Sequence, residues 1–440
     1  MKPSKSLIYL LIGLCPVLSL YCGTEPLNQA PSGPDNNGVV TTQEGSITVQ
    51  ACGTRDTLPS ASDQDIAALV KGNTDFACDM YKKLSAAGNT FFSPYSISIA
   101  LAMTWAGART ETEAQMASAL HFTLDQTKLH PAFDGLDLAL KARANNDGFD
   151  LNIVNQLWGE KTYYFLPDFL KTLSVNYGAA LRLLDFINNP EPSRVTINAW
   201  VSGQTNGRIQ DLIPSGEITP ATTLVLTNAI YFNAQWADTF QKEMSMNQTF
   251  YRNNDTVSAP FMHQEATFRY AASADFDALE LPYKGNELSM LFILPAAGKM
   301  ASVASSLTAD FIAGLSGSLA AQKVIVAIPK FKFATPSLSI RDILVSLGMA
   351  DAFSPGVADF SGIDGTRSLS IYDVLHKAFV AVDERGTEAA AATAVIVVGT
   401  SIEMPPPVQF TANRPFIFLI RDNVSGAVLF MGRLEDPVIN

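Results

Sequence analysis

The residue types most often used in catalysis and metal binding are few in this chain and widely spaced. There are four histidines, which are His121, His130, His263 and His376. Their spacing is not that of metal ligands, and the chain lacks the G-x-S-x-G, H-E-x-x-H, C-x-x-C and G-x-x-x-x-G-K-S/T motifs. A Ser–His–Asp site can assemble from distant residues, so these absences lower the expectation of an enzyme only in part. We expect no metal and no cofactor.

A stretch near the C-terminus, DERGTEAAAATAVIVV at 383–398, is a candidate of another kind. It is rich in alanine, the best helix former. It ends in valine and isoleucine, which favour strands. Taken alone, the stretch is most simply an exposed helix or a linker.

Composition and charge narrow the function classes. The chain of 440 residues is 47% hydrophobic and 16% charged, as expected of a soluble globular protein. Its net charge is −12, and its basic runs do not exceed Lys82-Lys83. Nucleic-acid binding needs clustered lysine and arginine, so we expect no nucleic-acid partner.

The N-terminus has the pattern of an export signal. Lys2 and Lys5 precede an apolar run, Leu7–Leu20, that is too short for a comfortable membrane span. We therefore assign 1–21 to a signal peptide and expect an exported protein. Cys22 closes the run as in the lipobox of bacterial lipoproteins, although Tyr21 is not the small residue usual there.

Two outcomes remain open at this cysteine. Lipidation of Cys22 would anchor the protein, and Gly23 at the next position favours the outer membrane or cell surface. Ordinary secretion with cleavage nearby would release the protein into the extracellular space. Any membrane attachment would be through that lipid alone.

Residues 22–62 are predicted to be a flexible tether, because they are rich in Pro, Gly, Ser, Asn and Asp. Residues 63–440 contain no second linker and are predicted to form one domain. Cys52 and Cys78 could form a disulfide in an exported protein, or both could remain thiols.

The domain is predicted to be α+β. Its first half shows helical periodicity, clearest at 65–84, where apolar residues recur every three to four positions. Short β-branched or aromatic runs, bounded by Gly, Pro or Asn, dominate its second half. These predicted strands lie at 222–232, 288–295, 323–333, 416–422 and 427–437.

At several motifs the chain resembles the serpin family, over essentially all of 63–437. Near the start, NTFFSPYSISIALAMTWAGARTETEAQM at 89–116 is similar to the family's helix-B region. FTANRPFIFLI at 410–420 fits its C-terminal pattern at every position. The motifs between them occur in family order: INAWVSGQTNGRIQDLI, LTNAIYFNAQW, ALELPYKG, AIPKFKF and DVLHKAFVAVDERGTEAAAATA.

The resemblance implies the serpin fold, with about nine helices, three β-sheets and an exposed reactive-centre loop at about 384–407. In serpins a protease cuts this loop, and its N-terminal part then inserts into the main sheet as a new strand. A serpin of this kind is expected to be a monomer without catalytic residues of its own.

The loop residues suit insertion. By alternation, the odd positions share one face, and none is charged or bulky; they are Thr387, Ala389, Ala391, Thr393, Val395 and Val397. Glu388 on the other face can point to solvent, and Gly386 gives backbone freedom at the hinge. The resemblance implies that Glu384, Gly386, Thr387, Ala389 and Ala391 are the hinge residues. Proline is confined to sheet edges and bulges, so Pro405–Pro407 limit insertion to about Met404.

Counting seventeen residues from Glu384, as inhibitory serpins do, places the cleaved bond between Thr400 and Ser401. No lysine or arginine occurs between Gly386 and Asn413, so a trypsin-like specificity pocket has no cation to bind. Elastase-like or subtilisin-like serine proteases are the expected partners. Cysteine proteases are a further possibility.

The resemblance also implies a cluster where the main sheet must part. Its expected members are Ser93, Ser96, Asn228 and His376, with Trp236 where the loop enters first. Without the family, His376 is most simply a core histidine and Trp236 a core aromatic residue.

The predicted function is suicide-substrate inhibition of serine proteases. Two alternatives remain: a non-inhibitory serpin that acts as a binding protein, and an exported hydrolase.

Overall fold

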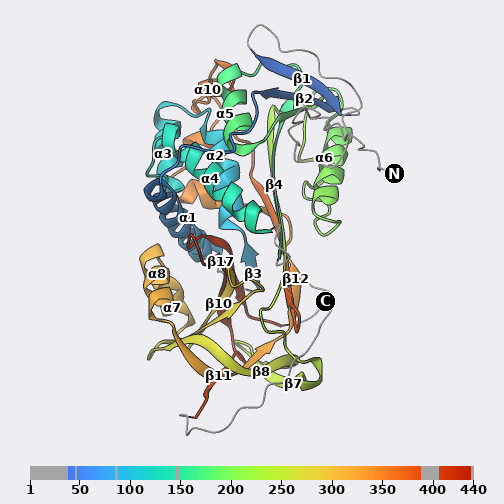
Figure 1. Ribbon diagram of the computed structural model, residues 1–440. Coiled ribbons are helices and arrows are strands. Elements are labelled where there is room, and N and C mark those ends of the chain that lie inside the picture. The colour runs from blue at the N-terminus through green and yellow to red at the C-terminus, as the bar shows by residue number, and fades with distance from the viewer. Residues whose placement is uncertain (1–37, 45–46, 85–87, 145–148, 388–405, 438–440) are drawn as a thin grey trace, which may run out of the picture.

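The computed structural model describes residues 38–437, except for 45–46, 85–87, 145–148 and 388–405. Helices α1–α5 gather against one face of a long sheet, and α6 lies on its other face (Figure 1). The described residues contain these α-helices: α1 (Asp63–Leu84), α2 (Pro94–Trp105), α3 (Thr110–Ala119), α4 (Gln126–Ala144), α5 (Pro167–Tyr177), α6 (Pro190–Gln204), α7 (Met300–Ser306), α8 (Ala309–Ser318), α9 (Arg341–Ser346) and α10 (Ser361–Asp364).

The central helix α2 explains how the helical layer is fixed to the sheets. Ser93 caps its N-terminus by accepting a hydrogen bond from the Ser96 N–H, and Pro94 occupies the first turn, where no donor is needed. Every residue of α2 is buried. A helix that is apolar on all sides needs partners all round, and α2 packs against α1 as well as strands of both sheets.

The long sheet, called sheet A here, contains the predicted insertion site. Its order is β1-β2-β5-β4-β6-β15-β14-β12, with β13 paired to β14. Its strands are β1 (Val39–Glu44), β2 (Ile47–Cys52), β5 (Leu181–Leu184), β4 (Phe149–Glu160), β6 (Leu224–Gln235), β15 (Gly386–Thr387), β14 (Leu375–Asp383), β12 (Phe331–Ala334) and β13 (Leu338–Ser339).

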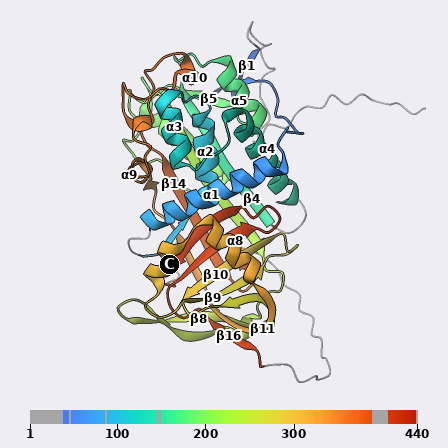
Figure 2. The same cartoon turned by 90° about the vertical axis from the view of Figure 1, so that its left-hand side faces the viewer.

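The second sheet, sheet B, has the order β16-β11-β8-β9-β10-β17-β18-β3, with β7 paired to β8. Figure 2 shows its strands β8, β9, β10, β11 and β16 toward the end of the molecule opposite α3, α5 and α10. Its strands are β16 (Val408–Thr411), β11 (Ala320–Pro329), β8 (Thr256–Ala272), β9 (Phe276–Pro282), β10 (Leu288–Pro295), β17 (Phe416–Asp422), β18 (Val428–Leu434), β3 (Thr90–Phe92) and β7 (Met246–Tyr251).

The α+β serpin architecture predicted from the sequence is confirmed, with one difference in how the strands are grouped. Hydrogen bonds join the described strands into two sheets, whereas three were expected. The reason is the length of β8, which pairs with β7, β11 and β9 along successive stretches. One strand thereby connects the two groups of strands that we expected to be separate.

Residues 39–52, predicted to belong to a flexible tether, instead form a hairpin at the edge of sheet A. β1 pairs with β2, and Thr48–Gln50 of β2 pair antiparallel with Leu181–Leu183 of β5. The segment is rich in valine, isoleucine and threonine, which favour strands, and β5 would otherwise be an unpaired edge. The tether prediction is therefore wrong for this segment.

Arg55 fixes the chain that follows the hairpin to α4. Its guanidinium donates to Asp134 Oδ1 at 2.7 Å and to Asp137 Oδ2 at 2.6 Å. Burial raises the pKa of the Asp134 carboxyl to about 6, against the opposing effect of Arg55. The N-terminal segment is thus tied to both a strand and a helix.

Two further features bear on the sequence predictions. Within the described part of the chain, Cys52 and Cys78 do not form a disulfide, and burial raises the pKa of the Cys78 thiol to about 12. Among the described helices, none combines the length and apolar character needed to cross a membrane.

Candidate functional site

The start of the segment predicted to be the reactive-centre loop lies inside sheet A. Gly386 and Thr387 form β15, which pairs antiparallel with β6 on one side and with β14 on the other. Thr387 lies opposite Ala234 of β6 and Val382 of β14 and is 2% exposed. A Cβ added at Gly386 would lie 2.0 Å from the carbonyl oxygen of Ala234, so the close approach of the two strands requires glycine here.

Two stacked aromatic rings lie beside this inserted segment. The Trp236 and Tyr283 ring centroids are 4.7 Å apart and nearly parallel. The Trp236 indole N–H donates to the Asp383 carbonyl oxygen at 3.0 Å, and its backbone N–H donates to the Arg385 carbonyl oxygen at 2.8 Å. Trp236 therefore holds the chain on the N-terminal side of Gly386.

Glu384 anchors the same segment through a charge. Its carboxylate lies 2.9 Å from the Lys330 ammonium and accepts a hydrogen bond from the Ser245 hydroxyl at 2.8 Å. Burial acts to raise the pKa of Glu384, but hydrogen bonds from Lys330 and Ser245 outweigh it and lower the pKa below its ordinary value. We call these loop-anchoring residues the hinge cluster: Trp236, Tyr283, Lys330, Glu384, Gly386 and Thr387.

A second cluster lies farther along β6, eight residues from Trp236, or about 27 Å at the usual strand rise. His376 Nδ1 lies 2.6 Å from Asn228 Oδ1, and His376 Nε2 accepts from the Ser93 N–H at 3.2 Å. Asn228 Nδ2 donates to Ser96 Oγ and to Asn155 Oδ1. We call this group the closure cluster: Ser93, Ser96, Asn155, Asn228 and His376.

The hydrogen bonds define the state of His376. Because Nε2 accepts from a backbone N–H, the ring proton must sit on Nδ1, where it can be donated to Asn228 Oδ1. The side chain is 1% exposed, and burial lowers its pKa to about 3. The imidazole is neutral at physiological pH, and it acts as a connector between β14, β6 and the start of α2.

At the level of the closure cluster, β6 and β14 pair directly with each other. Leu375–Ala378 pair in parallel with Thr227–Ile230, so four residue pairs close the sheet at this point. The register of β14 relative to β6 is the same in this directly paired region as it is where β15 lies between the two strands. A strand can therefore enter between them by lateral separation, without any sliding of β6 along β14.

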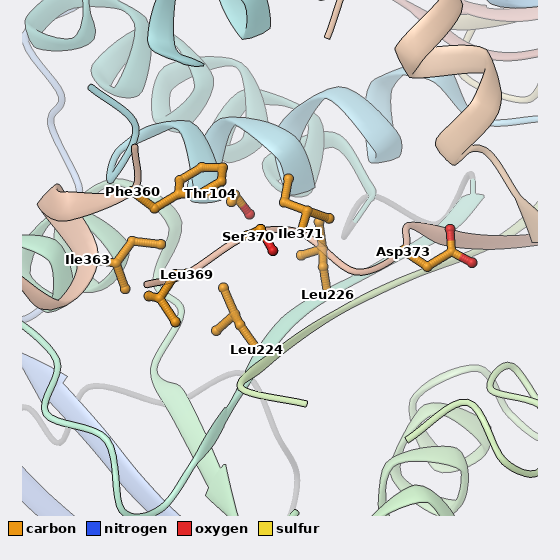
Figure 3. Close-up of a pocket in the computed structure, with 9 residues that line it drawn as sticks. All are labelled: Thr104, Leu224, Leu226, Phe360, Ile363, Leu369, Ser370, Ile371 and Asp373. Atoms are coloured by element: carbon orange, nitrogen blue, oxygen red, sulfur yellow. The ribbon is translucent and has the colours of Figure 1, made fainter. Parts of the chain in front are cut away.

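Beyond the closure cluster the two strands separate, and an opening lies on each face of the sheet. The inner opening, shown in Figure 3, has about 350 Å³ of empty space, part of it continuous with solvent. Leu224 and Leu226 of β6 line it together with Leu369 and Ile371, and Thr104 of α2 adds a hydroxyl. The outer opening shares Leu224, Leu226 and Asp373 and is bounded by Ile213 and Ile218.

The segment between α6 and β6 covers the outer face of β14. The Lys377 ammonium donates to the Gln210 carbonyl oxygen at 2.7 Å, and the Ser337 hydroxyl donates to the Leu212 carbonyl oxygen. The Arg208 guanidinium lies 5.9 Å from the centre of the Phe379 ring. Opening of the sheet must disturb these contacts.

The structure brings together some of the predicted site residues and leaves others undescribed. Ser93, Ser96, Asn228 and His376 form one network, whereas Trp236 lies at the hinge cluster. Ala389, Ala391, Thr400, Ser401 and Cys22 lie outside the described residues, so what was predicted for them stays a prediction.

Sequence reasoning missed three members of these clusters: Asn155, Tyr283 and Lys330. No spacing in the sequence connects Tyr283 with Thr387, since their contact depends on the pairing of distant strands. Within the described residues, no group of three or more His, Cys, Asp or Glu could hold a metal ion.

Comparison with known proteins identifies the family. The model of the serpin family, described as serine protease inhibitors, matches residues 71–437. A serpin-like protein of Thermococcus kodakarensis is 42% identical over 371 residues, covering 84% of this chain and 86% of that protein. The human leukocyte elastase inhibitor is 41% identical over 382 residues, covering 84% and 99%.

Structural comparison agrees with the sequence match. The crystal structure of tengpin, a thermophilic serpin in its native state, superimposes with a TM-score of 0.76 at 29% identity. The match covers 87% of this chain and 96% of tengpin. The chain belongs to the serpin family, whose members are mostly protease inhibitors rather than enzymes.

Proposed function

We propose that this serpin inhibits serine proteases as a suicide substrate. The protease serine would attack the carbonyl carbon of Thr400, and the Thr400–Ser401 peptide bond would break. The leaving nitrogen of Ser401 would take up a proton, and Thr400 would remain esterified to the protease. Insertion of the loop from residue 388 onward would then move the acyl-enzyme away before water hydrolyses the ester.

One observation carries this proposal: Gly386 and Thr387 already occupy the first two positions of the strand that insertion would complete. Continued in the same register, Thr393 would fall between Asn228 and His376. A threonine hydroxyl there can replace hydrogen bonds that Asn228 and His376 lose when β6 and β14 separate. Neighbouring strands are about 4.8 Å apart, so a new strand would double the distance between β6 and β14.

The same register accounts for the two openings. Val395 would lie between Leu226 and Val374, and Val397 would lie beside Leu224, with their side chains toward the inner opening. Ile396 would point into the outer opening beside Val225 and Asp373. Burial of each of these side chains contributes about 1.5–3 kcal/mol, which favours insertion of the end of the loop.

The loop sequence supports proteases that prefer small or apolar residues. No cation lies between Gly386 and Asn413, so elastase-like and subtilisin-like enzymes are the proposed targets and trypsin-like enzymes are not. A relative named as an inhibitor of leukocyte elastase supports the same class. Cysteine proteases with similar pockets remain a second group for the test panel.

The proposed site of action is outside the cell. The signal-like residues 1–21 support export, and Cys22 supports a lipid anchor at the outer membrane or cell surface. Mass spectrometry of Cys22 in protein isolated from its native membrane would distinguish a lipid adduct from a cleaved, secreted N-terminus.

The proposal is tested by mixing residues 38–440 with an elastase-type protease, followed by denaturing electrophoresis and mass spectrometry. A denaturant-stable adduct with the mass of both chains, less a released peptide that begins at Ser401, is expected. Loop cleavage without an adduct, across serine proteases of elastase and subtilisin type and papain-like cysteine proteases, would contradict inhibition. That result would favour the alternative of a non-inhibitory serpin that acts as a binding protein.

A further inference from the structure

The hinge cluster contains a hydrogen bond that links the reactive-centre loop to sheet B. The Tyr283 hydroxyl lies 2.8 Å from the Thr387 hydroxyl. Tyr283 follows β9, whereas Thr387 is the last described residue before the undescribed part of the loop. Tyr283 also forms a backbone bridge with Trp236, so the contact lies where the end of β9 meets the end of β6.

Both hydroxyls are removed from water. Tyr283 is 0% exposed and Thr387 is 2% exposed, and burial raises the pKa of Tyr283 so that its hydroxyl stays protonated. A buried hydroxyl that loses its partner incurs the full cost of its desolvation. The side-chain hydroxyl of Thr387 thus depends on the Tyr283 hydroxyl for its hydrogen bond in the folded protein.

The tyrosine is itself held in place. Its ring stacks on Trp236 and packs edge-on against Phe232 at 5.3 Å. Its backbone N–H donates to the Leu288 carbonyl oxygen. Tyr283 is therefore a fixed group to which Thr387 binds.

We propose that Tyr283 is a positioning residue that keeps the start of the reactive-centre loop inserted in sheet A before any protease cuts it. β15 is only two residues long and pairs with β6 and β14 through those two residues alone, so the loss of this side-chain contact should release Thr387 from the space between the strands more often. For its effect on inhibition this proposal rests on the proposed function. Because Gly386 and Thr387 are already paired in sheet A, the cut loop only has to extend an existing strand. Extension of a paired strand is easier than its initiation, so insertion should be faster.

The test compares three variants of the uncut chain by hydrogen–deuterium exchange of the peptide that contains Gly386 and Thr387. Tyr283→Phe removes the hydroxyl and keeps the stacked ring, Thr387→Val removes the partner hydroxyl, and Thr387→Ser retains it. Exchange about tenfold faster is expected for the first two, from the cost of an unpaired buried hydroxyl. Thr387→Ser should exchange like the unmodified protein.

The control variant is Tyr270→Phe, which removes another tyrosine hydroxyl at 2.8 Å from a partner, Asp277, on sheet B. It should leave exchange at Thr387 unchanged. Unchanged exchange in Tyr283→Phe would overturn the proposal. So would faster exchange spread equally over β10 and β17, which would mean a general loss of stability.

The stoichiometry of inhibition is a second measurement, and it separates a failure of the positioning role from a failure of the proposed function. If the protein inhibits, Tyr283→Phe should raise the moles of serpin consumed per mole of protease at least twofold, while the rate of loop cleavage stays the same. Faster exchange without any inhibition in the unmodified protein would support the positioning role and contradict the proposed function. Raised exchange with an unchanged stoichiometry would contradict the link between the inserted start and inhibition.

Discussion

Asn228 and His376 face each other across the junction of β6 and β14, both as paired residues of the two strands and through a 2.6 Å contact between Oδ1 and Nδ1. The two strands that loop insertion would separate are thus held together by backbone and side-chain contacts at the same level. Ser93 connects this pair to α2, since its backbone N–H donates to His376. Opening of the sheet requires the loss of this pair.

Asn228→Ala should destabilise the uncut protein. The substitution removes the hydrogen bonds that the Asn228 amide makes with His376 Nδ1, Ser96 Oγ and Asn155 Oδ1. We expect a loss of about 1–3 kcal/mol in the free energy of unfolding, measured by denaturant titration. Asn247→Ala, on the exposed side of β7, serves as the control, and equal stability of the two variants would contradict the role of the closure cluster.

Acid should weaken the fold through two buried histidines. Burial lowers the pKa values of His130 and His376 to about 3, against 6.5 when unfolded. Below pH 6.5 the unfolded chain binds protons that the folded chain does not, so stability is lost as pH falls toward 3. The expected slope is about 1.4 kcal/mol per pH unit for each histidine.

This slope can be assigned to His376 by substitution. Between pH 6 and 4, the slope of the free energy of unfolding against pH should be smaller in His376→Gln than in the unmodified protein. The difference should correspond to the uptake of one proton, or about 1.4 kcal/mol per pH unit. The comparison of slopes does not depend on how much the variant is destabilised overall. An unchanged slope would mean that the folded protein accepts a proton on His376.

Thr387→Arg should convert the inhibitor into a substrate. Thr387 lies between two strands and is 2% exposed, and a guanidinium cannot be buried there without a partner. We expect loop cleavage at the normal rate and at least a roughly fivefold rise in stoichiometry. Glu388→Arg, which alternation directs to solvent, is the control; the same stoichiometry in Thr387→Arg as in this control would defeat the insertion argument.

Arg55→Ala should show that the N-terminal segment belongs to the folded domain. The substitution leaves the buried carboxyl group of Asp134 without its cation and leaves Asp137 with Lys141 alone. We expect a loss of about 2–4 kcal/mol in the free energy of unfolding. The double variant Asp134→Asn/Asp137→Asn should reduce the effect of Arg55→Ala, and an effect near zero in both backgrounds would restore the tether interpretation.

The sequence was informative where local pattern and family motifs agreed. The periodicity at 65–84 predicted α1, which begins two residues earlier at Asp63. The odd–even alternation predicted that Thr387 would face the core, and Thr387 is buried there against Tyr283. Four of the five residues expected to lie at the parting of the sheet form one network, because all four lie on elements that the motifs fix.

Other features depended on contacts that the sequence does not show. The hairpin at 39–52 has strand-forming residues, but its stability comes from the edge of β5, and the polar composition around it suggested a tether. Tyr283 and Lys330 reach the hinge cluster from sheet B and the turn before β12. The two openings exist because β6 and the chain before β14 diverge, which no local pattern specifies.

The central claim is that strand insertion supplies the energy for inhibition, and the stability of the cut protein tests it most directly. We would cleave the loop with a protease that is not inhibited and compare the thermal unfolding of the cut and uncut chains. The account predicts a rise in the unfolding temperature of at least about 10 °C, because a full strand is added to sheet A. An unchanged unfolding temperature, with the loop shown to be cut, would contradict it.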